Sequence, residues 1–289
     1  MKREWISGYL FILPSVFLLA VLLIYPLLLT FNLSLYDVSL TATRFLGWGA
    51  YQRLLTSPML YVVFRNSVVW TILVVFFQFW LGLGSALVLN RSFFGRTLVR
   101  GIVILPWVMP GVVAAMVWRL MYEPQLGLIN HYLRVLGLIE KPVTWLSLPG
   151  LALYSVIVAA IWKGFPFSTL MYLAGLQTVP EELYEASEID GAGEWKKFIH
   201  VTLPTMKPII IITLLLTFIW TFNYFELVHV MTGGGPAETS HIFPTYIYTL
   251  GFRRFRFGDA SRFAVLNFIF LLIFSLLYIR LSLRRESLE

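Results

Sequence analysis

Side chains that could do chemistry are few in this chain, and the most regular set follows residue 220. Asn223, Glu226 and His229 recur every three residues, a spacing that would put them on one side of a helix. Amide and carboxylate oxygens hydrogen-bond hydroxyl groups, and nearby aromatic rings could stack on the faces of a sugar. The candidate substrate-binding residues are therefore Trp220, Asn223, Tyr224 and Glu226.

Two other interpretations of this set have to be weighed. Three glycines and Pro236 follow at once, so the polar residues could instead mark a helix that is emerging into water. His229 and Glu226 supply two metal ligands, whereas a zinc site needs three or four protein ligands. We therefore expect no bound metal.

No catalytic centre can be recognised elsewhere in the sequence, and nucleotide binding by the P-loop motif is excluded. A P-loop requires a lysine directly after a glycine, because the backbone amides of the glycine-rich loop cradle the phosphates. None of the six lysines follows a glycine. Neither a Ser–His–Asp arrangement nor a paired-carboxylate pocket is visible. We expect a chain that is not an enzyme and holds no cofactor of its own.

The most acidic stretch of the chain, residues 178–208, is the second candidate for function. Six carboxylates fall within fourteen residues there. Thr178 and Glu181 have the spacing of a capping box, which predicts the start of a short helix, and Gly191 permits a turn after it. A second short helix should follow and end at Leu203–Pro204, so that the stretch forms a helix–turn–helix.

The excess of acid indicates which kind of surface this stretch contacts. Helices that lie on anionic lipid are usually rich in Lys and Arg, whereas residues 178–208 carry carboxylates that such lipid would repel. A protein partner with basic groups fits better. A solvated acidic loop and an interfacial helix are the plainer alternatives.

The composition around these polar stretches is that of a membrane protein. The 289 residues are 58% hydrophobic and only 13% charged, with a mean hydropathy of +0.79, whereas soluble domains are about 25% charged. The chain has no cysteine, which excludes disulfides and thiolate chemistry. Its net charge of +7 is scattered between apolar segments rather than gathered into a stripe, so we expect no nucleic-acid partner.

Six windows without an ionised side chain locate the membrane-spanning segments. A helix needs roughly 20 apolar residues to cross the hydrocarbon core, and each window is near that length or longer. Backbone groups cannot stay unpaired in lipid, and the windows lack the alternation of barrel strands, so helices are expected. We predict one all-α polytopic membrane domain over residues 1–289, with spans at about 9–31, 67–89, 100–121, 150–173, 207–231 and 262–281.

The basic residues do not by themselves orient these spans. With both termini in the cytoplasm, eleven Lys and Arg would lie inside and ten outside, so the positive-inside rule is close to a tie. Lys163 falls within the fourth span. A charge at membrane depth usually faces a cavity or a partner, although Lys163 could also snorkel to the interface.

Residues 178–208 resemble the EAA loop of bacterial ABC-importer permeases. The family pattern is Glu-Ala-Ala, three residues, Gly, nine residues, Ile, one residue and Leu-Pro. Here it reads Glu185-Ala186-Ser187, then Gly191, then Val201-Thr202-Leu203-Pro204. The spacing is met throughout, and only Ser187 and Val201 depart from the pattern, each by a small change.

The resemblance extends beyond the loop to the carbohydrate-uptake branch of the family, the MalF and UgpA type. Two runs carry it, AGLQTVPEELYEASEIDGAGEWKKF and the glycine-rich MTGGGPAETSHIFPTYIYTLGFRRFRFGDASRFAVL. It covers residues 65–280, and the count of six spans agrees with it.

This resemblance implies a function and a topology. In the family the EAA loop is cytoplasmic, which puts both termini inside, and it forms a coupling helix that docks on a separate ATPase subunit. Glu185 would pair with a basic group there, and Gly191 would let the loop turn tightly. The remaining motif positions are Ala186, Ser187, Leu203 and Pro204. The chain would then be the permease subunit of an ATP-driven sugar importer and form half of its translocation pathway.

The partners follow from the same resemblance. An ATP-binding cassette ATPase dimer would hold the ATP and Mg. A second homologous permease subunit would complete the pathway, and an extracellular sugar-binding protein would deliver the sugar. The complex would work by alternating access, surrounded by lipid, in the plasma (inner) membrane of a bacterium or archaeon.

Two other classes of protein compete with this interpretation. A secondary transporter or channel driven by an ion gradient would want carboxylates within its spans, where only Glu226 qualifies, and it would leave the acidic loop without a task. The other class is a membrane scaffold with no transported substrate. Neighbouring genes for a sugar-binding lipoprotein and a second EAA-bearing permease would argue against a scaffold.

Overall fold

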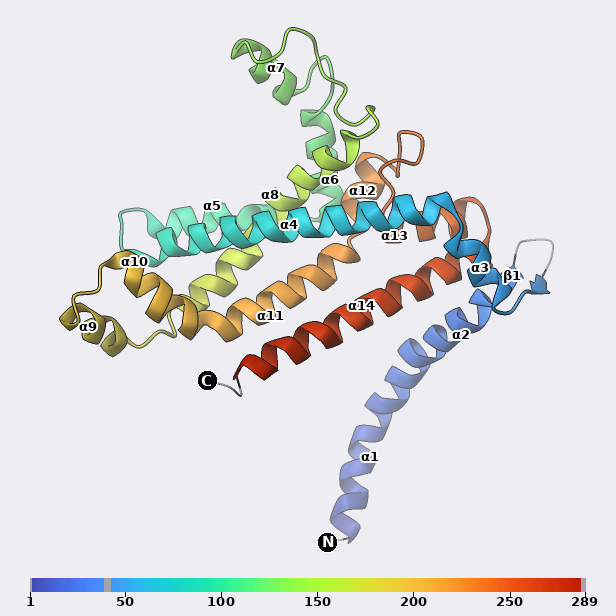
Figure 1. Ribbon diagram of the computed structural model, residues 1–289, viewed down its shortest axis with the longest axis horizontal. Coiled ribbons are helices and arrows are strands. Elements are labelled where there is room, and N and C mark those ends of the chain that lie inside the picture. The colour runs from blue at the N-terminus through green and yellow to red at the C-terminus, as the bar shows by residue number, and fades with distance from the viewer. Residues whose placement is uncertain (1, 39–42, 287–289) are drawn as a thin grey trace. The chain divides into compact units, whose positions relative to one another are not determined.

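The computed structural model describes residues 2–38 and 43–286, and most of them lie in helices (Figure 1). The expected all-helical membrane architecture is confirmed. Met1 and Glu289, to which the prediction of cytoplasmic termini refers, lie outside the described residues. The chain divides into two compact units, and each is described by itself.

The first unit comprises Met1–Tyr61 and Tyr246–Ile273. It begins with one long helix that contains a single π-helical turn, α1 (Lys2–Leu19), η1 (Ala20–Ile24) and α2 (Tyr25–Ser34). Two short antiparallel strands, β1 (Tyr36–Val38) and β2 (Thr43–Phe45), and α3 (Gly49–Leu55) follow. The later part holds the π-helical turn η3 (Thr249–Arg253) and the first half of α14 (Phe257–Glu286).

A buried arginine fastens the start of α14 to the end of α2. Arg262 is 4% exposed, and its Nη1 donates to Ser34 O at 3.2 Å and to Tyr36 O at 3.0 Å. Its Nη2 pairs with the carboxylate of Asp259. Gly258 lies so close to Tyr36 O that a Cβ would collide with it. The buried charge is therefore fully paired, as its desolvation requires.

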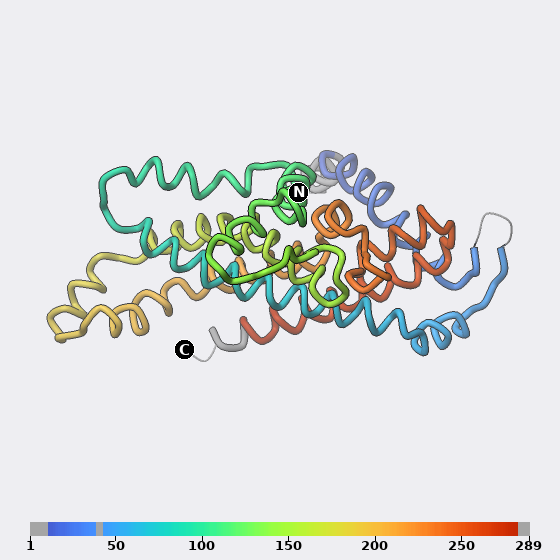
Figure 2. The backbone as a smooth tube through the Cα atoms, turned by 90° about the horizontal axis from the view of Figure 1, so that it is seen from above, coloured from blue at the N-terminus to red at the C-terminus, as the bar shows by residue number. Residues whose placement is uncertain are grey.

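The second unit comprises Val62–Thr245 and Phe274–Glu289. It contains most of α4 (Pro58–Asn90) and the helices that follow it. These are α5 (Arg96–Val108), α6 (Gly111–Met121), α7 (Leu128–Val135), α8 (Ala152–Leu176), α9 (Glu181–Ile189), α10 (Glu194–Lys197), η2 (Phe198–Thr202), α11 (Leu203–Phe222), α12 (Glu226–Met231) and the start of α13 (Phe243–Tyr248). Figure 2 shows α9 and α10, in gold, as a projection at one end of this unit.

Two apolar clusters hold the second unit together. One joins α4, α6, α8 and α12 around the fully buried Trp70 and Leu227. The other joins α4, α8 and α11 around the fully buried Tyr172 and Met206. Trp70 Nε1 donates to Thr221 O at 2.9 Å, so the polar edge of this buried ring is satisfied as well.

Five helices of the described residues are long and apolar enough to cross a membrane. They are Phe11–Ser34, Pro58–Asn90, Ala152–Leu176, Glu194–Met231 and Phe257–Ser282. A sixth candidate is the pair formed by α5 and α6, which are bent by 96° relative to each other (Figure 1). Each predicted span falls on one of these six segments.

The predicted third span, 100–121, differs from the structure because it is not one helix. Pro110 has no backbone donor, and it disfavours helical geometry in the residue before it. Met109 accordingly is extended, with φ −61° and ψ 133°. The chain therefore leaves α5 at Val108 and starts α6 at Gly111 in a new direction.

Close packing of α4 on α8 leads to a first prediction, at Gly82. A Cβ there would stand 2.5 Å from Ser168 Cβ and 3.1 Å from the Ser168 carbonyl carbon. We expect Gly82→Ala to destabilise the protein by about 1–3 kcal/mol, because a packed interface has no room for an added methyl group. Thermal unfolding in detergent should show this as a lower Tm.

Gly84→Ala on the same helix is the matched control. Nothing lies within 4 Å of the position that its Cβ would take, so this change should be neutral or slightly stabilising through helix propensity. Equal Tm values for the two variants would contradict the packing that we describe.

Candidate functional site

The acidic loop, residues 178–208, forms two short helices with a glycine turn between them. α9 ends at Ile189, and Gly191 takes a left-handed conformation with φ +74°. Gly191 N donates to Glu188 O at 3.0 Å, and Ala192 N donates to Ser187 O at 2.9 Å. Glycine is favoured here because a side chain would strain this conformation. The predicted turn at Gly191 is confirmed.

The predicted capping box at the start of α9 is wrong. Thr178 Oγ1 donates to Gly175 O at 2.8 Å, so this hydroxyl satisfies the end of α8 rather than the start of α9. Pro180 is the residue that precedes the first turn, and no side chain caps the helix. A hydroxyl between two helices can serve either end, and spacing alone favoured the wrong one.

The predicted helix end at Leu203–Pro204 is also wrong. α10, the π-helical turn η2 and α11 follow one another without a break. Pro204 lies in the first turn of α11. A proline would clash with the carbonyl four residues before it, and the wider π turn over residues 198–202 places that carbonyl elsewhere. The acidic loop is therefore continuous with the helix that enters the membrane.

Three polar contacts tie the acidic loop into one body. Lys197 Nζ donates to Glu188 Oε1 at 2.6 Å, which joins α10 to the end of α9, and to Glu194 Oε1 at 3.2 Å within α10. The hydroxyl groups of Tyr184 and Thr202 are 2.9 Å apart and connect α9 to η2. A force applied to α9 would therefore reach the base of α11.

The outer face of this loop combines apolar and acidic groups. Leu183, Ile189 and Trp195 are 44%, 88% and 71% exposed. Glu185 and Ala186 are exposed on α9, and Gly191 and Pro204 are exposed as well. Ser187 and Leu203 are half-buried. Exposed large apolar side chains rimmed by charge are typical of a protein-binding surface.

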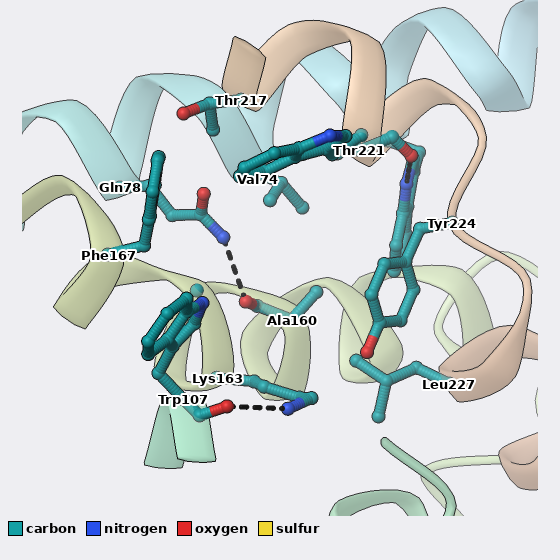
Figure 3. A pocket seen from close by; sticks show the side chains of 13 residues that line it. Val74, Gln78, Trp107, Ala160, Lys163, Phe167, Thr217, Thr221, Tyr224 and Leu227 are labelled. Atoms are coloured by element: carbon teal, nitrogen blue, oxygen red, sulfur yellow. Dashed lines mark hydrogen bonds between the residues drawn. The ribbon is translucent and has the colours of Figure 1, made fainter. Parts of the chain in front are cut away.

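A cavity of ≈140 Å³ lies between α4, α5, α8 and α11 (Figure 3). Its aromatic walls include the rings of Trp107 and Phe167, whose centroids are 5.9 Å apart, and of Trp220, 4.9 Å from Phe167. Its polar side chains are those of Gln78, Lys163, Thr217, Thr221 and Tyr224.

The polar groups of the cavity differ in how they are satisfied. Gln78 Nε2 donates to Ala160 O at 3.0 Å, and Lys163 Nζ donates to Met109 O at 2.7 Å. Tyr224 Oη is buried and makes no hydrogen bond with the described residues. Apolar walls with a few convergent polar groups are the usual make-up of a small-molecule site.

The structure brings together two of the four predicted substrate-binding residues. Trp220 and Tyr224 line the cavity, whereas Asn223 and Glu226 do not. The expected single helical face is wrong, because α11 ends at Phe222 and α12 begins at Glu226. Asn223 Nδ2 donates back to Ile219 O at 3.3 Å.

Sequence reasoning missed Gln78, Trp107 and Phe167 as cavity residues. One signal was available, because Gln78 is a buried amide in an otherwise apolar span, and such residues usually have a partner or a function. Trp107 and Phe167 give no such signal, because aromatic residues are common throughout the apolar segments. Within the described residues, no three His, Asp or Glu side chains come together to hold a metal ion.

Comparison with known proteins identifies the family of the chain. Residues 78–285 match the family model described as "Binding-protein-dependent transport system inner membrane component". The trehalose/maltose transport system permease protein MalF of Thermococcus litoralis is 37% identical over 99% of this chain and 96% of that protein. The lactose transport system permease protein LacF of Rhizobium radiobacter is 32% identical, over 88% and 86%.

A solved structure is similar over nearly the whole length. It is a bacterial alginate ABC transporter in complex with an alginate pentasaccharide-bound periplasmic protein. The chain matches it with a TM-score of 0.84 and 26% identity, over 98% of this chain and 96% of that one.

The turn in the acidic loop generates a second prediction. Gly191→Ala should destabilise the loop locally by roughly 1–2 kcal/mol, because an L side chain is disfavoured in the left-handed region. Gly193→Ala is the control, since Gly193 has φ −72° and nothing lies within 4 Å of its Cβ position. Hydrogen exchange of residues 181–200 should become faster in Gly191→Ala alone. Equal exchange rates in both variants would contradict a turn that requires the left-handed conformation at residue 191.

Proposed function

The chain belongs to the family of binding-protein-dependent transport system inner membrane components, and from this premise we propose that it imports a sugar. It is the permease subunit of a binding-protein-dependent ABC sugar importer, a multi-pass inner-membrane protein and a non-catalytic subunit. The observation that carries the sugar assignment is the aromatic-walled cavity, considered beside the sugar-transport relatives.

The cavity suits the chemistry of a sugar. The flat rings of Trp107, Phe167 and Trp220 can lie against the apolar faces of a sugar ring. The unpaired hydroxyl of Tyr224 and the amide of Gln78 can exchange hydrogen bonds with its hydroxyl groups. Its ≈140 Å³ is less than the ~300 Å³ of a typical small-molecule site. We therefore assign to this chain half of the pathway, and the other half to a second homologous permease.

The acidic loop is the proposed contact with an ATP-binding cassette ATPase dimer, which would bind the ATP and Mg. Its exposed Leu183, Ile189 and Trp195 would fill an apolar depression, and Glu185 would pair with a basic group. Ala186 and Ser187 are small enough to let that surface come close, and Gly191 provides the turn. Leu203 and Pro204 continue the loop into α11.

The path from this loop to the cavity supports coupling by alternating access. α11 starts at the loop and lines the cavity with Thr217, Trp220 and Thr221 near its other end. Movement of the ATPase subunits would tilt α11 together with the loop and so open the cavity to one side or the other. An extracellular sugar-binding protein would deliver the sugar. The loop would lie in the cytoplasm, with both termini on the same side.

The coupling role is tested by Glu185→Ala in the complex reconstituted with its partner subunits. Hydrolysis stimulated by the binding protein and sugar uptake should both fall roughly tenfold, as for the loss of ~1.4 kcal/mol from a charge pair. Glu140→Ala, at an exposed carboxylate between α7 and α8, should leave both rates unchanged. Unchanged rates in Glu185→Ala would rule out its role in coupling.

The cavity is tested by Trp220→Ala. Sugar carried per ATP hydrolysed should fall about tenfold, because the ring would contribute about 1.5 kcal/mol of stacking to a bound sugar, while hydrolysis in the absence of sugar should stay the same. Trp80→Ala is the control, since Trp80 is 55% exposed and lies outside the cavity lining. A normal ratio in Trp220→Ala would place the sugar elsewhere.

A further inference from the structure

The break between α5 and α6 leaves backbone groups without intrahelical partners at both of its ends. The last carbonyls of a helix and its first amides have no intrahelical partners, and in lipid no water replaces them. Met109 and Pro110 are both extended, with ψ 133° and 137°. The end of α5 therefore carries a partial negative charge and the start of α6 a partial positive one.

Lys163 on α8 meets the negative end of this break. Its ammonium donates to Met109 O at 2.7 Å and lies 3.5 Å from Pro106 O. It also lies 3.4 Å from Trp107 O, a contact that Figure 3 shows. The first contact is a strong charged hydrogen bond, and the two longer ones are mainly electrostatic. Lys163 thus serves as a C-cap supplied by another helix.

Glu226, the first residue of α12, meets the positive end. Its carboxylate lies directly on Gly111, the first residue of α6, so that a Cβ at Gly111 would collide with it. Tyr224 Oη would be 3.1 Å from the same Cβ. A carboxylate at this position is favoured by the helix dipole. Two opposite charges from two other helices therefore lie on the two ends of one broken helix.

The broken helix also forms a wall of the cavity. Trp107 is the penultimate residue of α5, its carbonyl oxygen faces Lys163, and its ring packs against Phe167. The direction in which α5 ends decides where this ring stands. Gln78 and Gly164 restrict the opposite side, because a Cβ at Gly164 would collide with the Gln78 amide.

We propose that Lys163 and Glu226 are positioning residues that clamp the α5–α6 break and thereby hold Trp107 in place as a wall of the sugar cavity. The proposal rests on the proposed function, because the cavity is taken to bind the sugar. Such a clamp also explains why Lys163 and Glu226 are present in apolar segments, where a charge is costly. Each compensates a helix end that the lipid would leave unpaired.

The absence of cysteine makes the clamp directly measurable. Leu98→Cys on α5 and Leu120→Cys on α6 are 69% and 71% exposed sites for spin labels, in a complex whose partner chains carry no reactive cysteine. The distance distribution between the labels should be narrow in the parent chain. Lys163→Met should broaden or shift it, whereas Lys163→Arg, which keeps the charge and the donors, should restore it.

Two further variants separate the clamp from a general loss of folding. Glu226→Gln keeps the shape of the side chain and should broaden the distribution on its own. Lys141→Met makes the same chemical change at an exposed lysine outside the break and should leave the distribution unchanged. An unchanged distribution in both Lys163→Met and Glu226→Gln would overturn the clamp.

Sugar uptake by the same complexes distinguishes the clamp from the proposed function. In Lys163→Met, sugar carried per ATP hydrolysed should fall about tenfold, as for one charged hydrogen bond, and Lys163→Arg should recover most of it. A changed distance distribution with a normal ratio would confirm the clamp but contradict the assignment of the cavity to sugar.

Discussion

Backbone groups freed at helix breaks constrain this structure more than any other feature. In the hydrocarbon core no water can pair with them, so each break needs a partner from within the chain. At the α5–α6 break the ammonium of Lys163 takes the carbonyl of Met109. At Pro204 the adjustment is made in the backbone itself, where η2 widens the helix before the proline. The first solution pairs a freed carbonyl with a side chain of another helix, and the second lets the helix continue through the proline.

The acidic loop and the cavity are connected because α11 is shared between them. Tyr184 and Thr202 fasten α9 to the turn that precedes α11, and Trp220 and Thr221 of the same helix stand at the cavity. Packed helices transmit displacement because their interiors have few voids. An element that is stiff along its length and anchored at both ends can carry a movement of the loop to the cavity without any chemistry in this chain.

The sequence was sufficient for some features because they depend on local rules. Each charge-free window falls on a candidate membrane-spanning segment, five single helices and one bent pair, since burial in lipid excludes ionised groups over a fixed length. The turn at Gly191 was predictable because glycine adopts the left-handed conformation readily. The start of α9 was not predictable in this way, because the hydroxyl of Thr178 had two helix ends within reach. The position of Pro204 inside a continuous helix was not predictable either, because a π turn has no characteristic residue spacing. Trp107 and Gln78 line one cavity only because distant helices pack together, so local patterns alone could not reveal the cavity.

The same constraint gives several basic residues a role other than marking the cytoplasmic side of the membrane. The positive-inside rule counts each Lys and Arg as a charge left in a loop, yet several of them serve as helix caps here. Arg96 Nε and Arg100 Nη2 both donate to Leu89 O, near the end of α4, at 2.7 and 3.2 Å. Arg262 is buried on Ser34 O and Tyr36 O. A Lys or Arg side chain that donates to backbone carbonyls marks the end of a helix and does not indicate on which side of the membrane a loop lies. Without Arg96, Arg100 and Arg262 the count would be nine inside and nine outside, so the basic residues still leave the orientation open, and the acidic loop is the better guide to topology.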